Sequence, residues 1–346
     1  MSAGVAEPFR PAWWLPGSHP QSMWGRLARP RRLVPLRREI VPTPDGDELV
    51  LDHVDAGGGA PRLLLLHGLE GSSYSVYVQG LAAAARRRGF AVTILNFRSC
   101  ARPPDDIGTM LPNRRPRFYH SGETGDADLV VRLLHRRAPR TPLVAAGASL
   151  GGNVLLKWLG ENPGQALLRA VATVSVPYDL AAGARFLETG AGPFYVAVFL
   201  RTLKEKVTDL AERFPEARGR IDLPRALAAK TFREFDDAAT APLHGFAGAD
   251  DYYARSSSLS FVGRIATPTL LISASDDPFV PEEVLPKVRS AASPAVTCLF
   301  SKAGGHVGFV AGPSPARAVY WAEETIVDWL RGALDPDSSA PPRESV

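Results

Sequence analysis

The stretch PLVAAGASLGGNVLLKWLGEN, residues 142–162, determines how the rest of the chain is interpreted. Its first part, 142–148, is an apolar run that is too short for a helix and typical of a buried parallel strand. Its last part, 152–162, has the pattern of a helix. The GASLG sequence between them is a G-x-S-x-G motif with Ser149 at its centre. A serine between a strand and a helix can be held on a sharp turn, with its side chain exposed above the edge of a sheet.

Segments of the same two kinds alternate on both sides of this stretch. We expect strands at 62–66, 90–97, 142–148, 169–177, 268–275 and 295–301, and helices at 78–88, 122–138, 152–162, from 281 onward and at 316–334. A hairpin is expected where two alternating runs flank the turn TPDGD at 43–47. Alternating strands and helices predict an α/β protein with a mostly parallel central sheet and helices on both faces.

One long helical segment interrupts this alternation. Residues 178–262 lie between two expected sheet strands and have mainly helical patterns, so we interpret them as an inserted helical cap. The remaining divisions are an N-terminal arm, 1–36, a core made of 37–177 and 263–334, and a disordered tail, 335–346. The arm holds three tryptophans and several prolines, which predicts an irregular segment packed on the body rather than a free tail.

The composition is that of a globular protein of 346 residues, 45% hydrophobic and 22% charged. Its two cysteines form no CxxC pair and its seven histidines show no HExxH spacing, so we expect no metal site and no cofactor. The N-terminus lacks the pattern of a signal peptide, and no apolar run approaches the ~18 residues of a membrane-spanning helix. We therefore expect a cytoplasmic protein without a transmembrane segment.

The net charge of +4 is small, although arginines cluster between residues 26 and 38. We interpret this cluster as a solvated arm rather than a nucleic-acid surface, because no basic motif with interleaved aromatic residues follows it. Peripheral contact with an anionic membrane stays open as an alternative, and the oligomeric state is not predicted.

Two further segments carry candidate catalytic residues. The expected strand 268–275 runs into the acidic pair Asp276-Asp277, and a glycine-rich loop after the last expected strand carries His306. The order Ser149, acid, His306 is the chain order of the triad in α/β-hydrolases. Either carboxylate of the pair could orient the histidine. Cys100 is a weaker candidate nucleophile, because it lacks the strand-turn-helix context.

Backbone N–H groups complete the expected site. The expected strand 62–66 runs into the turn HGLEG, where the N–H of Leu69 can face a reacting carbonyl group. The N–H of Leu150, the residue after the serine, is the second expected donor of an oxyanion hole. We interpret His67 as a structural residue, because it precedes this turn.

With these residues in place, the chain resembles one α/β-hydrolase family over more than 300 residues. This family contains the YheT-type esterases, the yeast medium-chain ethyl ester synthases/esterases and the ABHD-type lipases, and is also called the AB hydrolase 4 family. The matching segments are HGLEGSS (67–73), NFRSCA (96–101), the histidine and glycine of YHSGETGDADLV (119–130), GASLGGNVLLKWLGE (147–161), VSVPYDL (174–180), FDDAATAPLHGFAGADDYY (235–253), ASDDPFVP (274–281) and GGHVGF (304–309).

The resemblance implies a carboxylic ester hydrolase that acts on short- to medium-chain acyl esters, with acylglycerols among them. It carries the catalytic triad onto Ser149, His306 and one acid of the pair. Many hydrolases of this kind place the acid four residues before a proline, which selects Asp277 through its spacing to Pro281. Two departures from the family pattern, Ser99 where the family commonly has glycine and GSHPQSM in the arm, lie near the expected acyl pocket or arm and so concern the substrate range rather than the triad.

Other functions use parts of the same pattern. An acyltransferase or ester synthase would use the same triad with an alcohol as acceptor, and it remains the main alternative. An epoxide hydrolase or dehalogenase would need an aspartate at position 149, and a binding module on this fold usually lacks a triad member. We also predict that the apolar run 194–200 walls the acyl pocket, the alternative being that it packs as the core of the cap.

Overall fold

The computed structural model describes residues 8–335 of the chain. One sheet has eight strands: β1 (Arg37–Pro42), β2 (Glu48–Val54), β3 (Arg62–Leu66), β4 (Ala91–Asn96), β5 (Leu143–Ala148), β6 (Val171–Val174), β7 (Thr269–Ala274) and β8 (Val296–Ser301). A second sheet pairs β9 (Val310–Ala311) with β10 (Val319–Tyr320). The helices of the body are α1 (Ser18–Ala28), α2 (Val76–Arg87), α3 (Gly125–Arg137), α4 (Leu150–Glu161), α12 (Val284–Ala291) and α13 (Trp321–Gly332).

The large sheet has the order β1-β2-β4-β3-β5-β6-β7-β8. The strands from β4 to β8 pair in parallel, whereas β2 is antiparallel to both of its neighbours. The fold is therefore the predicted α/β-hydrolase fold with a mostly parallel sheet. Because parallel strands end at the same edge, the loops that follow β3, β5, β7 and β8 all leave from one side of the sheet.

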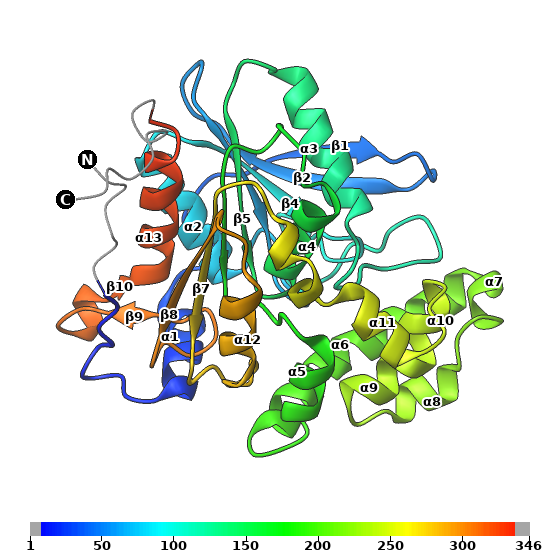
Figure 1. The fold of residues 1–346 in the computed structure, drawn as a ribbon. Helices are drawn as coiled ribbons and strands as arrows, with labels where there is room; N and C mark the ends of the chain where they lie inside the picture. Colours follow the sequence, from blue (N-terminus) through cyan, green and yellow to red (C-terminus); the bar gives the residue numbers. More distant parts are fainter. Residues whose placement is uncertain (1–7, 336–346) are drawn as a thin grey trace.

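Helices cover both faces of this sheet (Figure 1): α2 and α13 lie on one face, and α3, α4 and α12 on the other. The strand β3 shows why its sequence is apolar at every position. Leu64 and Leu66 belong to the core that α3 and α4 cover, whereas Leu63 and Leu65 belong to the core that α2 and α13 cover. Successive side chains of a strand point to opposite faces, so a strand buried on both sides shows no polar alternation.

The segment expected to form a cap is helical. Its helices are α5 (Leu180–Phe186), α6 (Gly192–Arg213), α7 (Pro215–Arg218), α8 (Leu223–Ala228), α9 (Phe232–Phe235), α10 (Ala241–Leu243) and α11 (Ala249–Ser256), with a π-helical turn at Asp236–Thr240. They gather beyond one end of the sheet (Figure 1). Several of them share an apolar core of their own, in which Val196, Leu200 and Phe235 are buried. The division of the chain into core and cap stays a prediction.

Most expected elements are present, and the differences lie at their ends. The expected hairpin forms from β1 and β2. The closing helix begins at Trp321 rather than 316, because Val319 and Tyr320 pair with β9 instead. The helix after the G-x-S-x-G motif begins at Leu150 rather than 152. Of the expected tail, only Asp335 lies within the described residues.

The arm corrects the sequence-based expectation in one respect. Its described residues, 8–36, pack on the body as predicted, but Ser18–Ala28 form a helix rather than irregular chain. Pro20 misled the prediction, although proline is tolerated in the first turn of a helix, where the N–H has no partner. Most arginines of the basic cluster are exposed, as expected, but Arg29 forms a bidentate, largely buried ion pair with Glu323 of α13.

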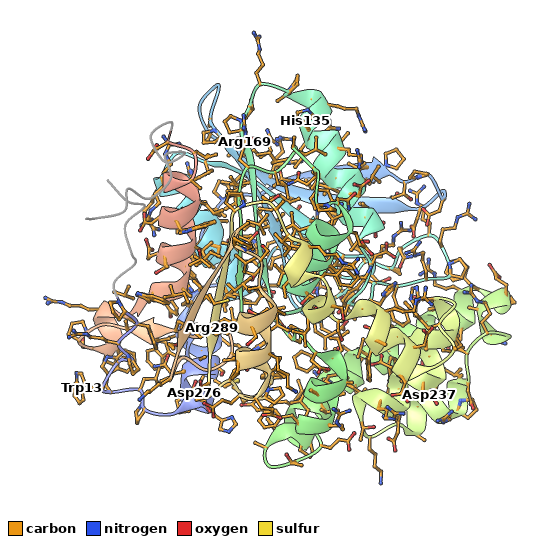
Figure 2. The ribbon with its side chains drawn as sticks, viewed as in Figure 1. Trp13, His135, Arg169, Asp237, Asp276 and Arg289 are labelled. Atoms are coloured by element: carbon orange, nitrogen blue, oxygen red, sulfur yellow. The ribbon has the colours of Figure 1, made fainter. Side chains whose placement is uncertain are left out.

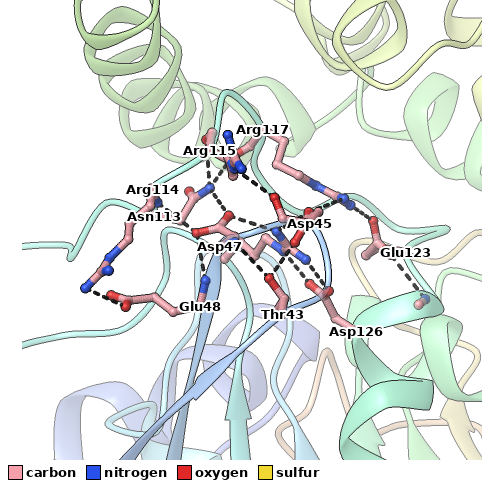
Figure 3. Close-up of polar contacts among 12 residues, drawn as sticks. Thr43, Asp45, Asp47, Glu48, Asn113, Arg114, Arg115, Arg117, Glu123 and Asp126 are labelled. Carbon is pink, nitrogen blue, oxygen red and sulfur yellow. Dashed lines mark hydrogen bonds and ion pairs between the residues drawn. The ribbon is translucent and has the colours of Figure 1, made fainter.

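Arg98 of the NFRSCA segment has a structural role. Its guanidinium group donates to Asp126 at the start of α3 and to Asp45 and Asp47 in the turn between β1 and β2. Figure 3 shows these carboxylates within a polar network that also includes Asn113. A buried guanidinium group must be paired, and here the pairing joins two segments that are far apart in the sequence.

The helices within residues 8–335 are all too short or too polar to span a bilayer.

Candidate active site

Ser149 lies on a strained turn between β5 and α4. Its φ is 52°, in the left-handed region that non-glycine residues rarely adopt. Two hydrogen bonds hold this conformation: the N–H of Ser149 donates to the carbonyl of Val174 at 2.9 Å, and its carbonyl accepts from Asn153 at 3.1 Å. Such strain persists only where the surroundings enforce it, and it occurs often at functional sites.

The two glycines of the motif are required because the backbone is crowded on both sides of Ser149. A Cβ atom at Gly147 would lie 2.6 Å from the carbonyl oxygen of Gly151. A Cβ atom at Gly151 would lie 2.5 Å from the carbonyl oxygen of His67 and 2.6 Å from that of Leu66. The neighbouring atoms are backbone and cannot rotate away, so only glycine fits at these two positions.

The structure brings His306 to Asp277. The Nδ1 atom of His306 lies 3.0 Å and 3.1 Å from the two carboxylate oxygens of Asp277. The Asp277 side chain is fully buried, and its Oδ1 also accepts from the N–H of Phe279 at 2.8 Å. A carboxylate on Nδ1 places the imidazole proton there and leaves Nε2 as the nitrogen that can accept a proton. The use of this pair in catalysis stays a prediction.

Asp276 has a different place. It lies near the end of β7 (Figure 2), and its Oδ1 accepts from the N–H of Gly305 at 2.9 Å. Burial raises the pKa of Asp276, and the charge of Asp277 beside it acts in the same direction. Asp276 therefore holds the backbone of the loop that carries His306, whereas Asp277 contacts the ring.

The end of β6 connects the serine to the histidine. Val174 accepts the hydrogen bond from Ser149, and the side chain of Ser175 accepts one from the N–H of Val307 at 2.9 Å. Two consecutive residues thus bind both the turn that carries Ser149 and the residue after His306. The three predicted triad residues are therefore gathered at one edge of the sheet.

The two predicted oxyanion donors lie beside this serine. Leu150 is the first residue of α4, and its N–H has no acceptor within the helix. In the turn after β3, Gly68 donates to the hydroxyl of Tyr77 and Glu70 to that of Tyr119. Within residues 8–335 no such acceptor takes the N–H of Leu69 between them. A Cβ atom at Gly68 would lie 3.0 Å from the Cβ atom of Ser149, so this turn contacts the serine directly.

His67 is structural, as the sequence indicates. Its Nδ1 lies 2.8 Å from the carbonyl of Gly68, and its Nε2 accepts from the N–H of Phe97 at 3.1 Å. Burial lowers the pKa of His67 to about 4. A neutral ring with both nitrogens engaged by backbone groups cannot serve as a second base.

A buried ion pair joins α6 to the turn after β3. The Lys206 ammonium donates to Glu70 and to Cys100, and all three groups are buried. Burial alone would raise the pKa of Glu70, but the adjacent ammonium holds it below the usual range. Burial raises the pKa of the Cys100 thiol to about 11, so the thiol is protonated and a poor nucleophile.

Ser99, one of the two departures from the family pattern, also lies near this pair. Its φ is 59°, a conformation that glycine adopts without strain, which explains why glycine suits this position. Ser99 lines a cavity of about 360 Å³ between α6 and the loop around 108–115, and Lys206 lines it as well.

Aromatic side chains lead from His306 toward α6. The ring of Phe279 lies 4.4 Å from that of His306, and Tyr195 and Phe199 of α6 lie 4.8 Å and 6.1 Å from Phe279. The apolar run 194–200 therefore divides three ways. Val196 and Leu200 are buried, Phe194 and Val198 are 70% and 40% exposed, and Tyr195 and Phe199 contact Phe279 beside His306.

Sequence reasoning missed several residues around this site: Phe279 and Lys206, together with Ser22, which accepts from the N–H of His306, and Gln21, which bonds to Val310. Phe279 lies within the quoted ASDDPFVP segment, so its position beside the acidic pair could have singled it out. Lys206 lies in the expected cap and has no sequence signal, whereas Ser22 lies in the GSHPQSM segment of the arm, which the sequence had already marked as a departure from the family pattern. Within the described part of the chain, no group of three or more His, Cys, Asp or Glu side chains is placed to hold a metal ion.

Comparison with known proteins identifies the family of this chain. Residues 61–313 match the model of the alpha/beta hydrolase fold family, which is more than half of the chain. The chain belongs to the α/β-hydrolase family. YheT of Escherichia coli (strain K12), whose name describes an esterase, is 37% identical over 95% of both chains. Mouse phospholipase ABHD3 is 31% identical over 91% of this chain and 76% of its own length.

Two further α/β-hydrolases resemble this chain at lower sequence identity. The monoacylglycerol lipase of Saccharomyces cerevisiae is 29% identical over 85% of this chain and 63% of its own length. Among solved structures, the Pyrococcus furiosus esterase Pf2001 covers 79% of this chain and 84% of its own, with 16% identity and a TM-score of 0.51. That likeness concerns the fold alone. Together with YheT and ABHD3, the sequence relatives identify the chain as a hydrolase of the esterase and lipase type.

Proposed function

We propose that this α/β-hydrolase is a serine carboxylic ester hydrolase acting on short- to medium-chain acyl esters. The observation that carries the proposal is the pairing of buried Asp277 with the partly buried His306, joined through the end of β6 to the strained turn at Ser149. An acid, a base and a serine in this arrangement match the roles of a catalytic triad. The related proteins named as a monoacylglycerol lipase and a phospholipase support acylglycerols and related lipids as substrates.

In the proposed mechanism, the Oγ atom of Ser149 attacks the acyl carbonyl while Nε2 of His306 takes its proton. Asp277 holds the imidazole tautomer and stabilises the imidazolium. The N–H groups of Leu69 and Leu150 stabilise the oxyanion of the tetrahedral intermediate. The intermediate collapses, and the leaving alcohol takes the proton from His306. Water then attacks the acyl-enzyme with His306 again as the base, which releases the carboxylic acid and regenerates Ser149.

Ser149→Ala tests this assignment. We expect hydrolysis of p-nitrophenyl esters, measured from acetate to palmitate, to fall to the 10³–10⁴-fold enhancement over water that binding and an oxyanion hole alone provide. A serine-directed phosphonate is expected to label Ser149 in the wild-type protein, as mapped by peptide mass. Cys100→Ser is the matched control and retains activity. Near-native turnover by the alanine variant would contradict the proposal.

The acyl-chain preference depends on α6. Because Val198 is exposed, the wall of the acyl pocket is better assigned to Phe199, which contacts Phe279 beside His306. We expect Phe199→Ala to lower kcat/KM for long-chain esters by about tenfold relative to acetate. The reason is that a lost pocket contact removes about 1–3 kcal/mol of discrimination. Val198→Ala, one residue earlier on the same helix, is the control. Equal effects on all esters would assign Phe199 to packing.

An alcohol can replace water as the acceptor in the same mechanism. Adding ethanol to the assay and quantifying ethyl esters against free acid distinguishes an ester synthase from a hydrolase. The cytoplasm stays the expected compartment, on the evidence of the two unpaired cysteines.

A further inference from the structure

The loop that carries His306, residues 302–309, is the most strained segment near the site. Val307 and Phe309 have φ values of 56° and 44°, and Gly304 and Gly305 also have positive φ. Left-handed conformations at valine and phenylalanine are unfavourable, so contacts from outside the loop must maintain them. The mechanism depends on this loop, because it places the base.

The helix α1 of the N-terminal arm supplies these contacts. The Oγ atom of Ser22 accepts a hydrogen bond from the backbone N–H of His306 at 2.8 Å and donates to the carbonyl of Ser18 at 2.7 Å. The neighbouring Gln21 side chain is buried. Its amide donates to the carbonyl of Val310 at 3.1 Å, and its Oε1 accepts from the N–H of Val310 at 2.7 Å.

Close packing accompanies these hydrogen bonds. A Cβ atom at Gly305 would lie 2.4 Å from the carbonyl oxygen of Ser18, and one at Gly308 would lie 2.3 Å from that of Gln21. The arm therefore lies directly against the backbone of the loop on both sides of His306. The body of the protein contributes the remaining anchors, at Asp276 and Ser175.

We propose that Ser22 and Gln21 are positioning residues for the base, so that the arm is part of the catalytic apparatus rather than a packing extension. This inference rests on the proposed function. Ser22 acts at the backbone N–H of His306 itself, and Gln21 acts four residues later, at Val310. Together they determine where the imidazole lies relative to Ser149.

Ser22→Ala tests the inference. We expect kcat to fall by about 10- to 100-fold, as for misplacement of a catalytic group by up to ~1 Å, while KM and the fraction of protein titrated by the phosphonate stay unchanged. Ser22→Thr restores kcat because it retains the hydroxyl. Ser18→Ala, on the same helix, is the matched control, since only the carbonyl of Ser18 contacts Ser22. Should Ser22→Ala fail to fold, the shape-matched pair Ser22→Thr and Ser22→Val isolates the hydroxyl group.

A double-variant cycle separates positioning from stability. If Ser22 acts through His306, Ser22→Ala has no further effect on the residual ester hydrolysis of His306→Ala. An equal loss in both backgrounds, or wild-type kcat per titrated site in Ser22→Ala, would overturn the inference. Failure of the proposed function would look different, because the wild-type protein would then neither turn over esters nor be labelled at Ser149.

Discussion

Two segments at the same edge of the sheet, the Ser149 turn (147–151) and the His306 loop (302–309), hold strained residues in different ways. The turn is held by its own glycines, by the first turn of α4 and by the adjacent strands β3 and β6. The loop is held by Asp276 and Asp277 after β7, by Ser175 after β6, and by Ser22, which lies 284 residues away in the sequence.

The two segments differ in what keeps their residues in the strained, positive-φ conformation. A sharp turn between a strand and a helix needs small residues at two positions, and adjacent elements then enforce its conformation. A loop of eight residues without regular structure has no such frame, so separate hydrogen bonds from several parts of the chain must define it. We therefore expect the turn to respond to changes within the motif, and the loop to respond to changes elsewhere in the chain.

The largest expected effect in this comparison is that of Asp277→Asn. The amide cannot hold the same imidazole tautomer, so we expect kcat to fall by about 10⁴-fold, as for the equivalent change in other triads. The thermal unfolding midpoint should change little, because the side chain keeps its shape. Steady-state kinetics on a p-nitrophenyl ester measures this effect. A loss below tenfold would show that Asp277 does not orient His306.

Gly151→Ala tests the turn. The new Cβ atom would lie 2.5 Å from a backbone oxygen of His67, so we expect a loss of roughly 1–3 kcal/mol in the free energy of unfolding, typical of overpacking, together with loss of esterase activity. Urea denaturation measures the first effect. Gly164→Ala is the control, because nothing lies within 4 Å of its Cβ position, and it should stay within about 0.5 kcal/mol of the wild type.

Gly305→Ala is the matching change in the loop. Its Cβ atom would meet the carbonyl of Ser18 in the arm. We therefore expect α1 to be displaced, which lowers kcat strongly while the free energy of unfolding changes less than in Gly151→Ala. If the two variants showed the same loss of kcat for the same loss in the free energy of unfolding, the distinction between the two segments would be wrong.

The smallest expected effect is that of Asp276→Asn. The amide oxygen can still accept from Gly305, so kcat should change only a few-fold, far less than in Asp277→Asn. The pKa of Asp276 is raised in the folded state, so its contribution to stability is present below about pH 4, the usual range for aspartate, and is lost as the pH rises through the folded pKa.

Stability measurements at several pH values test this linkage. The stability of the wild type relative to Asp276→Asn should therefore decrease as the pH rises above about 4, because the variant has no carboxyl group to ionise. Urea denaturation of both proteins at pH 4.5 and pH 8 measures the difference. A difference that does not change with pH would contradict the assignment of Asp276 as a buried anchor of the loop.

Much of the fold was predictable because burial leaves a direct pattern in the sequence. The parallel strands β3 and β5 are apolar at nearly every position since both faces are covered, and the strand-turn-helix context of Ser149 follows from local sterics. The arm helix α1 was missed because prolines and glycines obscure its pattern. Pairing between β9 and β10 involves only two residues each, too few for any alternation to appear.

The sheet, the helices on both faces, the Ser149 turn and the order of serine, acid and histidine could all be predicted from the sequence alone. These depend on periodicity, on short-range sterics and on the chain order of the motifs. The tertiary structure pairs His306 with Asp277, the acid that the spacing to Pro281 had selected, and it alone showed that Asp276 holds the loop backbone and that the Ser22 hydroxyl of the arm accepts a hydrogen bond from the N–H of His306. The physical reason is that a hydrogen bond between distant segments needs one donor and one acceptor in register, and neither group leaves a periodic pattern in its own part of the chain.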